Sequence, residues 1–454
     1  MVIKLFNTLS REKETFKPLK SGQVGMYHCG PTVYDTPHLG NYRTFVMGDL
    51  IRRVFEYNNY KVTQVMNLTD VDDKTIRRSR EESIPLQTLT RKYEDLFLEG
   101  LKSLDILLPH HVIRATEHIE GMIKLVQTLI DKGVAYKAAD GVYVSINKVK
   151  DYGALAHLKL SAETKERIVN DEYDKENPRD FSVWKFRSED DGDVSWEAPF
   201  GAGRPGWHIE CSAMSMEILG PTIDIHTGGA DLMFPHHTNE IAQSESATGK
   251  RFVNYWMHGA FMDIVAEKMA KSKGNIIKLE DLVEHGITPL AYRYWLLTAH
   301  YRSPVNFTYE AVKAAQNGLN RLIGALGSYP DGGKAIPAYQ ERFLGLINDD
   351  LDMPQAVALV WELVKDGGCS DADKKATILD FDRVFGLRLG SAIKFEARDI
   401  PDDVKNLRDA REEARKNKDW KKADELRAQL ELKGFDVKDT QHGTIIAGII
   451  GPKS

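Results

Sequence analysis

The sequence has few cysteines and no long apolar run, and each absence excludes a class of protein. Only three cysteines occur among 454 residues. That number is too small for a disulfide framework, so we expect a chain that works in the reducing cytoplasm. No apolar run approaches the ~20 residues of a membrane span, and the opening residues MVIKLFNTLSREKE lack the apolar core of a signal peptide. We therefore expect a cytoplasmic protein without a membrane segment.

Strong charge of one sign is also missing. The formal net charge is −6, so the chain is not a uniformly basic nucleic-acid binder, and any contact with nucleic acid must use local patches. At ~150 residues per domain, the length fits about three domains, each large enough to bury a core.

A candidate metal site can be assembled from residues that are scattered over half of the chain: Cys29, Cys211, His236 and Glu240. The last two lie four apart in PHHTNE, so on a helix they share one face. Pro235 suits the first position of that helix. Two thiolates, an imidazole and a carboxylate suit tetrahedral Zn²⁺. Taken singly, each residue also fits an ordinary role, such as a buried thiol or a solvated glutamate.

A phosphate-binding turn is indicated at His38-Leu39-Gly40-Asn41. The string follows a predicted strand over residues 24–28 and opens a predicted helix over residues 42–57, in which Phe45, Val46, Leu50 and Val54 recur at helical spacing. A helix N-terminus presents free N–H groups and the positive dipole end to an anion. Alone, this short string is a weak signal.

A second short string, EKMAKSKGN at residues 267–275, is rich in lysine. Isolated lysine clusters are usually solvated loops. Two lysines that close over a triphosphate would stabilise the charge that develops on departing pyrophosphate. The ordered pair, HLGN early and KMAKS late, is much more specific than either string.

HLGN and KMAKS resemble the HIGH and KMSKS motifs of class I aminoacyl-tRNA synthetases. Longer strings resemble the cysteinyl-tRNA synthetase family in particular: MNLTDVDDK (66–74), PRDFSVWKF (178–186), GRPGWHIECSAM (203–214) and GGADLMFPHHTNEIAQS (228–244). The resemblance runs from about residue 2 to about residue 444. Asn41 and Ala270 depart from the usual motifs, in which a histidine and a serine stand, and both motif lysines are kept.

The resemblance implies a cysteine–tRNA ligase with ATP, L-cysteine and tRNA(Cys) as partners, Mg²⁺ accompanying ATP, and a monomeric chain. It also implies one zinc ion, held by Cys29, Cys211, His236 and Glu240. Both the family match and the spacing to Glu240 favour His236 over its neighbour His237. Zn²⁺ binds thiolate far more strongly than a neutral hydroxyl, so the ion would select cysteine against serine.

The resemblance further assigns roles in the reaction. His38 and Asn41 would contact the ATP phosphates, with Lys268 and Lys271 closing from the other side. The full set expected to bind ATP is His38, Gly40, Asn41, Gly229, Asp231, Lys268, Lys271 and Ser272. For Asp231 the ribose of ATP and the substrate ammonium stay open as partners. Gly30, Thr69 and Trp207 are candidates for the cysteine pocket, although Thr69 and Trp207 fit core packing equally well.

The expected fold is α/β, a Rossmann-like class I synthetase fold split by an insertion. We expect the first catalytic half over residues 1–115, the insertion over 116–205, the second half with the KMAKS loop over 206–275, a helical bundle over 276–395, and an anticodon-recognition domain over 396–454. The parts of the catalytic fold follow from βαβ patterning around HLGN. Polar, Gly/Pro-rich stretches mark the insertion.

The last segment holds a lysine- and arginine-rich helix pair around Trp420. Mixed charge alone fits a solvated helical face, whereas the resemblance implies contact with tRNA phosphates. The basic residues expected to make that contact are Arg408, Arg411, Arg415, Lys421 and Lys422. We expect Trp420 to pack within the helix pair, with stacking on an unpaired base as the alternative.

Two other functions fit parts of the sequence. The cysteine ligase of mycothiol synthesis shares the catalytic core and zinc site but joins cysteine to an amino sugar, and it has no use for an anticodon domain. A non-catalytic tRNA-binding relative would not need His38, Lys268, Lys271 and a complete ligand set.

Overall fold

The fold is described from a computed structural model. The structure describes residues 2–158, 180–264, 277–398, 402–433, 435–440 and 443–448. The chain forms two compact units. One comprises Met1–Asp263, Tyr301–Val305 and Asn348–Leu351, and the other comprises Ile264–His300, Asn306–Ile347 and Asp352–Ser454. The five segments drawn from the sequence remain a prediction.

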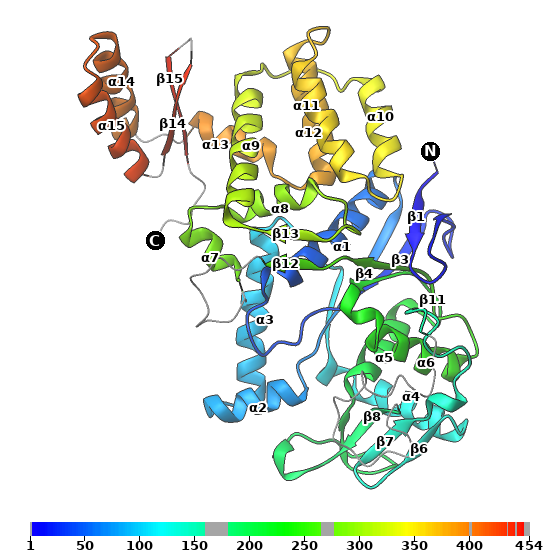
Figure 1. Cartoon of the computed structure of the whole chain (residues 1–454). Helices are drawn as coiled ribbons and strands as arrows, with labels where there is room; N and C mark the ends of the chain where they lie inside the picture. The colour runs from blue at the N-terminus through cyan, green and yellow to red at the C-terminus, as the bar shows by residue number, and fades with distance from the viewer. Residues whose placement is uncertain are drawn as a thin grey trace. The chain divides into compact units, whose positions relative to one another are not determined.

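A five-stranded parallel sheet forms the centre of the first unit, in the order β11-β10-β3-β4-β5. Figure 1 labels its strands β3, β4 and β11. Its strands are β3 (Gln23–His28), β4 (Lys61–Leu68), β5 (His111–Arg114), β10 (Ile223–Gly229) and β11 (Val253–Gly259). Helices connect them: α1 (Leu39–Tyr57), α2 (Asp73–Glu82), α3 (Leu86–Ser103), α4 (Ile119–Asp131), α5 (Trp207–Leu219) and α6 (His236–Thr248). The predicted parallel α/β fold is confirmed.

The predicted interruption between β5 and β10 contains a small antiparallel sheet of its own. Its order is β6-β7-β8-β9, formed by β6 (Ala135–Lys137), β7 (Gly141–Val144), β8 (Phe181–Phe186) and β9 (Gly203–Pro205). Short pairs also form between β1 (Lys4–Asn7) and β2 (Glu12–Thr15) and between β12 (Met262–Ile264) and β13 (Val305–Phe307). The β-rich sequence YWMHGAFMDI at residues 255–264 is divided between β11 and β12.

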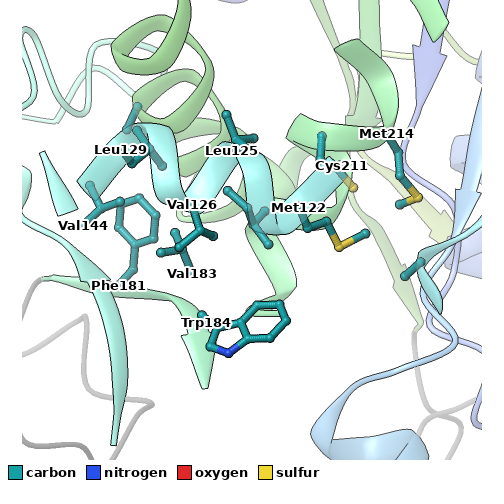
Figure 2. Close-up of a cluster of buried hydrophobic side chains, with 14 of the residues drawn as sticks. Met122, Leu125, Val126, Leu129, Val144, Phe181, Val183, Trp184, Cys211 and Met214 are labelled. Carbon is teal, nitrogen blue, oxygen red and sulfur yellow. The ribbon is translucent and has the colours of Figure 1, made fainter. Parts of the chain in front are cut away.

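A hydrophobic core joins the inserted sheet to the helices that carry the site. On α4, Met122, Leu125, Val126 and Leu129 recur at helical spacing and are buried. Figure 2 shows these side chains packed towards Val144 of β7 and Phe181, Val183 and Trp184 of β8, with Cys211 and Met214 of α5 at the other end. The core thus fixes α5, and with it one of the candidate metal ligands.

The second unit is mainly helical, as expected. Its helices are α7 (Leu279–Glu284), α8 (Pro289–Leu297), α9 (Tyr309–Ser328), α10 (Pro337–Ile347), α11 (Met353–Lys365), α12 (Asp371–Phe385), α13 (Leu389–Arg398), α14 (Asp402–Lys416) and α15 (Trp420–Leu432). Strands β14 (Phe435–Thr440) and β15 (Gly443–Gly448) form an antiparallel pair. Among the described residues, none of the helices has both the length and the apolar character needed to cross a bilayer.

Candidate active site and metal centre

The carboxyl ends of β3 and β10 bring together the residues around Cys29. Strand β3 ends at His28, which lies in register with Thr227 of β10. The backbone N–H of Cys29 donates to the carbonyl of Thr227 at 3.4 Å. In open parallel sheets, ligands bind at this edge. Cys29 therefore stands at the place where an α/β fold builds its site.

The four predicted metal ligands converge at this edge. The Cys29 sulfur lies 3.7 Å from the sulfur of Cys211 and 3.7 Å from Oε1 of Glu240. Nε2 of His236 lies 3.2 Å from the same carboxylate oxygen, as the shared helical face of α6 requires. All four residues are buried, and their ligand atoms lie within 4.8 Å of one another. This set of donors and these distances fit a zinc ion.

A second set of ligands overlaps the first. It shares Cys29 and Glu240 and replaces Cys211 and His236 with His226 and His237. Nε2 of His226 lies 2.9 Å from Oε2 of Glu240, and Nε2 of His237 lies 3.4 Å from the Cys29 sulfur. The two sets thus share one thiol and one carboxylate. The geometry alone admits both, so the choice of the first set stays a prediction.

Buried charges determine how these groups ionise. Burial opposes ionisation of Glu240, but His226 and His236 lower the pKa of its carboxyl to about 2. Burial would lower the pKa of His236, yet Cys211 and Glu240 raise it to about 10. Burial would raise the pKa of Cys211, but the hydrogen bond from Cys29 and the interaction with His236 together lower it to about 6, whereas burial raises the pKa of Cys29 well above its ordinary value. Binding of a divalent cation would release the remaining thiol proton.

The HLGN turn forms the N-terminus of α1, which begins three residues before the predicted start because His38 caps it. Nδ1 of His38 accepts a hydrogen bond from the N–H of Asn41 at 3.3 Å, and Oδ1 of Asn41 accepts one from the N–H of His38 at 3.1 Å. Burial lowers the pKa of His38, opposed by Asp231. A neutral ring with Nδ1 as acceptor carries its proton on Nε2, so His38 presents an N–H donor.

Asp231 reaches the same turn from the end of β10. A side chain on Gly229 would bring a Cβ within 2.3 Å of Oδ1 of Asp231, so glycine is what lets the carboxylate lie against the backbone here. Gly40 is similarly confined, with His38 Cε1 2.9 Å from where its Cβ would be. The charge of Asp231 acts on the ring of His38, so the turn of Gly229 and Asp231 lies near the turn of His38 and Gly40. Lys268, Lys271 and Ser272 lie outside the described residues.

The predicted cysteine pocket lies beside the candidate metal ligands. Trp207 is the first residue of α5, is 38 % exposed, and places its ring centroid 4.2 Å from that of His236. A side chain of this size half open to solvent is not simple core packing. Thr69 is buried and donates to Oε2 of Glu210 at 2.8 Å. Burial and Cys211 raise the pKa of Glu210, and the hydrogen bond from Thr69 opposes the rise.

Several polar residues at this site were not anticipated. His208 follows Trp207, and its Nδ1 lies 2.9 Å from Nδ1 of His236. His237 contacts His258, with 2.7 Å between ring nitrogens, and burial lowers the pKa of His258 to about 3. His226 belongs to β10, every residue of which is buried. A fully buried parallel strand has no polar-out alternation, so its pattern could not single out this histidine.

Two expectations for the C-terminal helix pair are wrong. Arg411 is buried at 2 % exposure and does not face solvent as a phosphate contact would. It occupies the inward stripe of α14 that includes Val404 and Ala414. Trp420, expected to pack inside, is 58 % exposed, and the guanidinium carbon of Arg415 lies 6.0 Å from its ring centroid. Trp420 starts α15, at the turn where α14 has already ended.

Comparison with known proteins gives, over most of the chain, the same family that the sequence motifs resemble. The sequence model of the tRNA synthetases class I (C) catalytic domain matches residues 15–317, and that of the cysteinyl-tRNA ligase anticodon binding domain matches residues 397–444. The cysteine–tRNA ligase of Protochlamydia amoebophila is 42% identical over 97% of this chain and 97% of its own length. That of Brachyspira hyodysenteriae is 43% identical, over 97% of this chain and 98% of its own.

Solved structures support the fold. Methionyl-tRNA synthetase of Mycobacterium tuberculosis, in complex with methionyl-adenylate, superposes with a TM-score of 0.56 at 17% identity. The match covers 82% of this chain and 91% of that one. A likeness at this identity concerns the fold alone, which is the class I synthetase fold.

Proposed function

Because the chain belongs to the cysteinyl-tRNA synthetase family of class I aminoacyl-tRNA synthetases, we propose that it activates L-cysteine with ATP and attaches it to tRNA(Cys). The observation that carries the proposal is the buried cluster of Cys29, Cys211, His236 and Glu240 at the carboxyl edge of the sheet, where the chain leaves β3 and runs on to the HLGN turn at the start of α1. The cluster of metal ligands suits the binding of a thiol, and the HLGN turn suits the binding of phosphate.

The reaction has two steps. The carboxylate of cysteine attacks the α-phosphorus of ATP, a P–O bond breaks, and pyrophosphate leaves. A terminal ribose hydroxyl of tRNA then attacks the acyl carbon, and AMP leaves. Protein groups act mainly by positioning and by charge stabilisation. In this account the Nε2–H of His38 and the free N–H groups of α1 hold the phosphates, with Mg²⁺ bound to ATP. Lys268 and Lys271 would close over the leaving group.

Selection of cysteine is assigned to the metal centre. A zinc ion held by Cys29, Cys211, His236 and Glu240 would supply a coordination position that prefers a thiolate to the hydroxyl of serine. Shape alone separates such close analogues by only about one to two orders of magnitude. Trp207, 38 % exposed and with its ring tilted against that of His236, would cover the amino acid beside that position. The ring of His226 would orient Glu240 through a hydrogen bond to Oε2, whereas the other carboxylate oxygen, Oε1, lies beside His236. Such hydrogen bonds to ligating groups are common around metal sites.

The neighbouring histidines of α6 distinguish the two ligand sets. His236→Asn should lower the zinc affinity by well over the 10–100-fold typical of changes to outer-sphere partners, because it removes a ligand. His237→Asn should lose about tenfold or less. Zinc per chain, measured by mass spectrometry during titration with a chelator, compares the two variants. The reverse order would place the ion in the set formed with His226 and His237.

The C-terminal helix pair is assigned to tRNA. The exposed ring of Trp420, with Arg415 nearby and the exposed Lys421 and Lys422 following it, suits stacking on an unpaired base next to phosphate contacts. A cysteine ligase acting on an amino sugar would have no use for this segment, which argues for tRNA as the acceptor.

Replacement of Trp420 tests that assignment. Trp420→Ala should raise the KM for tRNA about tenfold, because stacking on one base contributes roughly 1–3 kcal/mol. Exchange of pyrophosphate with ATP in the presence of cysteine should not change. Trp420→Phe keeps an aromatic face and should stay close to the original KM. An unchanged KM in the alanine variant would remove Trp420 from the tRNA contact.

Amino-acid-dependent exchange of labelled pyrophosphate into ATP tests the activation step. Cysteine should support exchange and serine should not. Absence of exchange with every amino acid would indicate a relative that keeps the fold without the chemistry.

A further inference from the structure

A chain of buried hydrogen bonds links the residue after Cys29 to the residue before Cys211, and it includes Gly30 and Thr69 of the predicted amino-acid pocket. The N–H of Gly30, the residue after Cys29, donates to Oδ1 of Asn67 at 2.9 Å. Nδ2 of Asn67 donates to the hydroxyl of Thr69 at 3.2 Å, and that hydroxyl donates to Oε2 of Glu210 at 2.8 Å. Glu210 immediately precedes the second cysteine ligand. The sequence did not point to Asn67 or Glu210.

The chain is built into the fold and shielded from water. Asn67 and Thr69 are each 1 % exposed and Glu210 is 0 % exposed. A Cβ on Gly30 would lie 1.7 Å from the carbonyl oxygen of Asn67, so glycine is required for this close approach. Within the part of the chain that the structure describes, the other carboxyl oxygen of Glu210, Oε1, has no hydrogen-bond partner. A buried polar atom without a partner costs free energy, so packing alone does not explain a glutamate at this position.

The direction of the hydrogen bonds fixes what Thr69 can offer to a ligand. A hydroxyl has one hydrogen and two lone pairs. Its hydrogen is given to Glu210, and one lone pair accepts from Asn67. One lone pair remains, so a ligand that contacts Thr69 must bring a hydrogen-bond donor. In an amino acid the α-ammonium is a donor and the α-carboxylate is only an acceptor.

We propose that Glu210 is a positioning residue of the amino-acid pocket, which by accepting the Thr69 proton leaves that hydroxyl as an acceptor for the α-ammonium of cysteine. The inference rests on the proposed function, since it needs cysteine as the substrate. It assigns to Glu210 a role in orienting the amino acid that is separate from the metal ligands. A purely structural role, in which the chain only aligns the two cysteines, would change metal content and the binding of any thiol.

Two variants of Glu210 and one ligand analogue separate these roles. Glu210→Gln keeps the shape and an acceptor oxygen, whereas Glu210→Met keeps the length and removes the acceptor. In pyrophosphate exchange, the methionine variant should raise the KM for cysteine about tenfold, the size of a lost hydrogen bond to a charged group. The KM for ATP and the zinc content should stay unchanged, and the glutamine variant should stay within about threefold. Inhibition by 3-mercaptopropionate, which is cysteine without its amino group, should be equal in all three proteins.

Thr69→Val removes the hydroxyl that Glu210 is proposed to orient, so it serves as the background for a double-mutant comparison. There the additional effect of Glu210→Met should disappear. Persistence of the effect, or an equal weakening of 3-mercaptopropionate, would overturn the inference. If Glu210→Met does not fold, Glu210→Leu takes its place, and it must likewise weaken cysteine and spare the analogue. Failure of the unmodified protein to activate cysteine would instead count against the proposed function.

Discussion

Replacing Cys211 with serine is expected to remove most of the discrimination between cysteine and serine while the chain stays folded. The two side chains are nearly equal in size, and Cys211 is 1 % exposed at the end of the α4–α5 core (Figure 2). The change therefore removes a metal ligand and disturbs the packing of the core little. We expect the ratio of kcat/KM for cysteine to that for serine to fall to about 100 or below, the limit of a pocket that selects by shape. Pyrophosphate exchange with each amino acid gives the ratio.

The remaining cysteine supplies the matched control. Cys369 lies far along the sequence, with its sulfur 3.4 Å from Oδ2 of Asp366, and Cys369→Ser should keep both zinc and selectivity. Circular dichroism of Cys211→Ser decides how the loss is interpreted. An unfolded variant would mean that the ion is structural, and a folded, zinc-free variant that still rejects serine would contradict selection by the metal.

Replacing His38 with serine should slow adenylate formation by about 10²–10³, the usual cost of one donor aimed at developing charge. Serine is a good helix N-cap, so α1 should keep its start while the ring is lost. The KM for cysteine should change little, because the ring acts at the phosphates. Single-turnover measurement of pyrophosphate release isolates this step.

His157 offers a control on the same unit. It is exposed and its ring lies 3.2 Å from the carbonyl of Thr8, so His157→Ser should keep the original rate. A His38→Ser enzyme within about threefold of the original rate would show that the phosphates depend on other donors. Since the pKa of His38 is lowered by burial, activity should not require an imidazolium, and it should not fall as the pH rises from 7 to 8.

The sequence was most informative where the chemistry is local. Helix α1 is opened by the HLGN string as predicted, and it begins at Leu39 because the His38–Asn41 cap adds three residues. Helical spacing correctly brought His236 onto the same face as Glu240, with 3.2 Å between Nε2 and Oε1. Local spacing cannot exclude His237, however, because that residue approaches Cys29 only through the fold.

Long-range contacts were missed for a physical reason. Glu210 and Asn67 are polar residues in buried positions, paired through Thr69 across more than a hundred residues of sequence. Composition assigns such residues to the surface. The assumption that charged residues lie on the surface also led to the wrong prediction for Arg411. Its spacing from Val404 and Ala414 along α14 nevertheless matches the buried stripe of that helix. Trp420 shows the converse error, because an aromatic residue at a helix start can lack a partner helix to cover it.

The central claim is that this chain joins cysteine to tRNA, and charging of total tRNA with labelled cysteine and ATP tests it most directly. The account predicts cysteine on the 3′ end of tRNA, in an amount that excess unlabelled serine does not reduce. Release of pyrophosphate with cysteine, without any charged tRNA, would contradict it and would indicate a different acceptor, of which an amino sugar is the first to try.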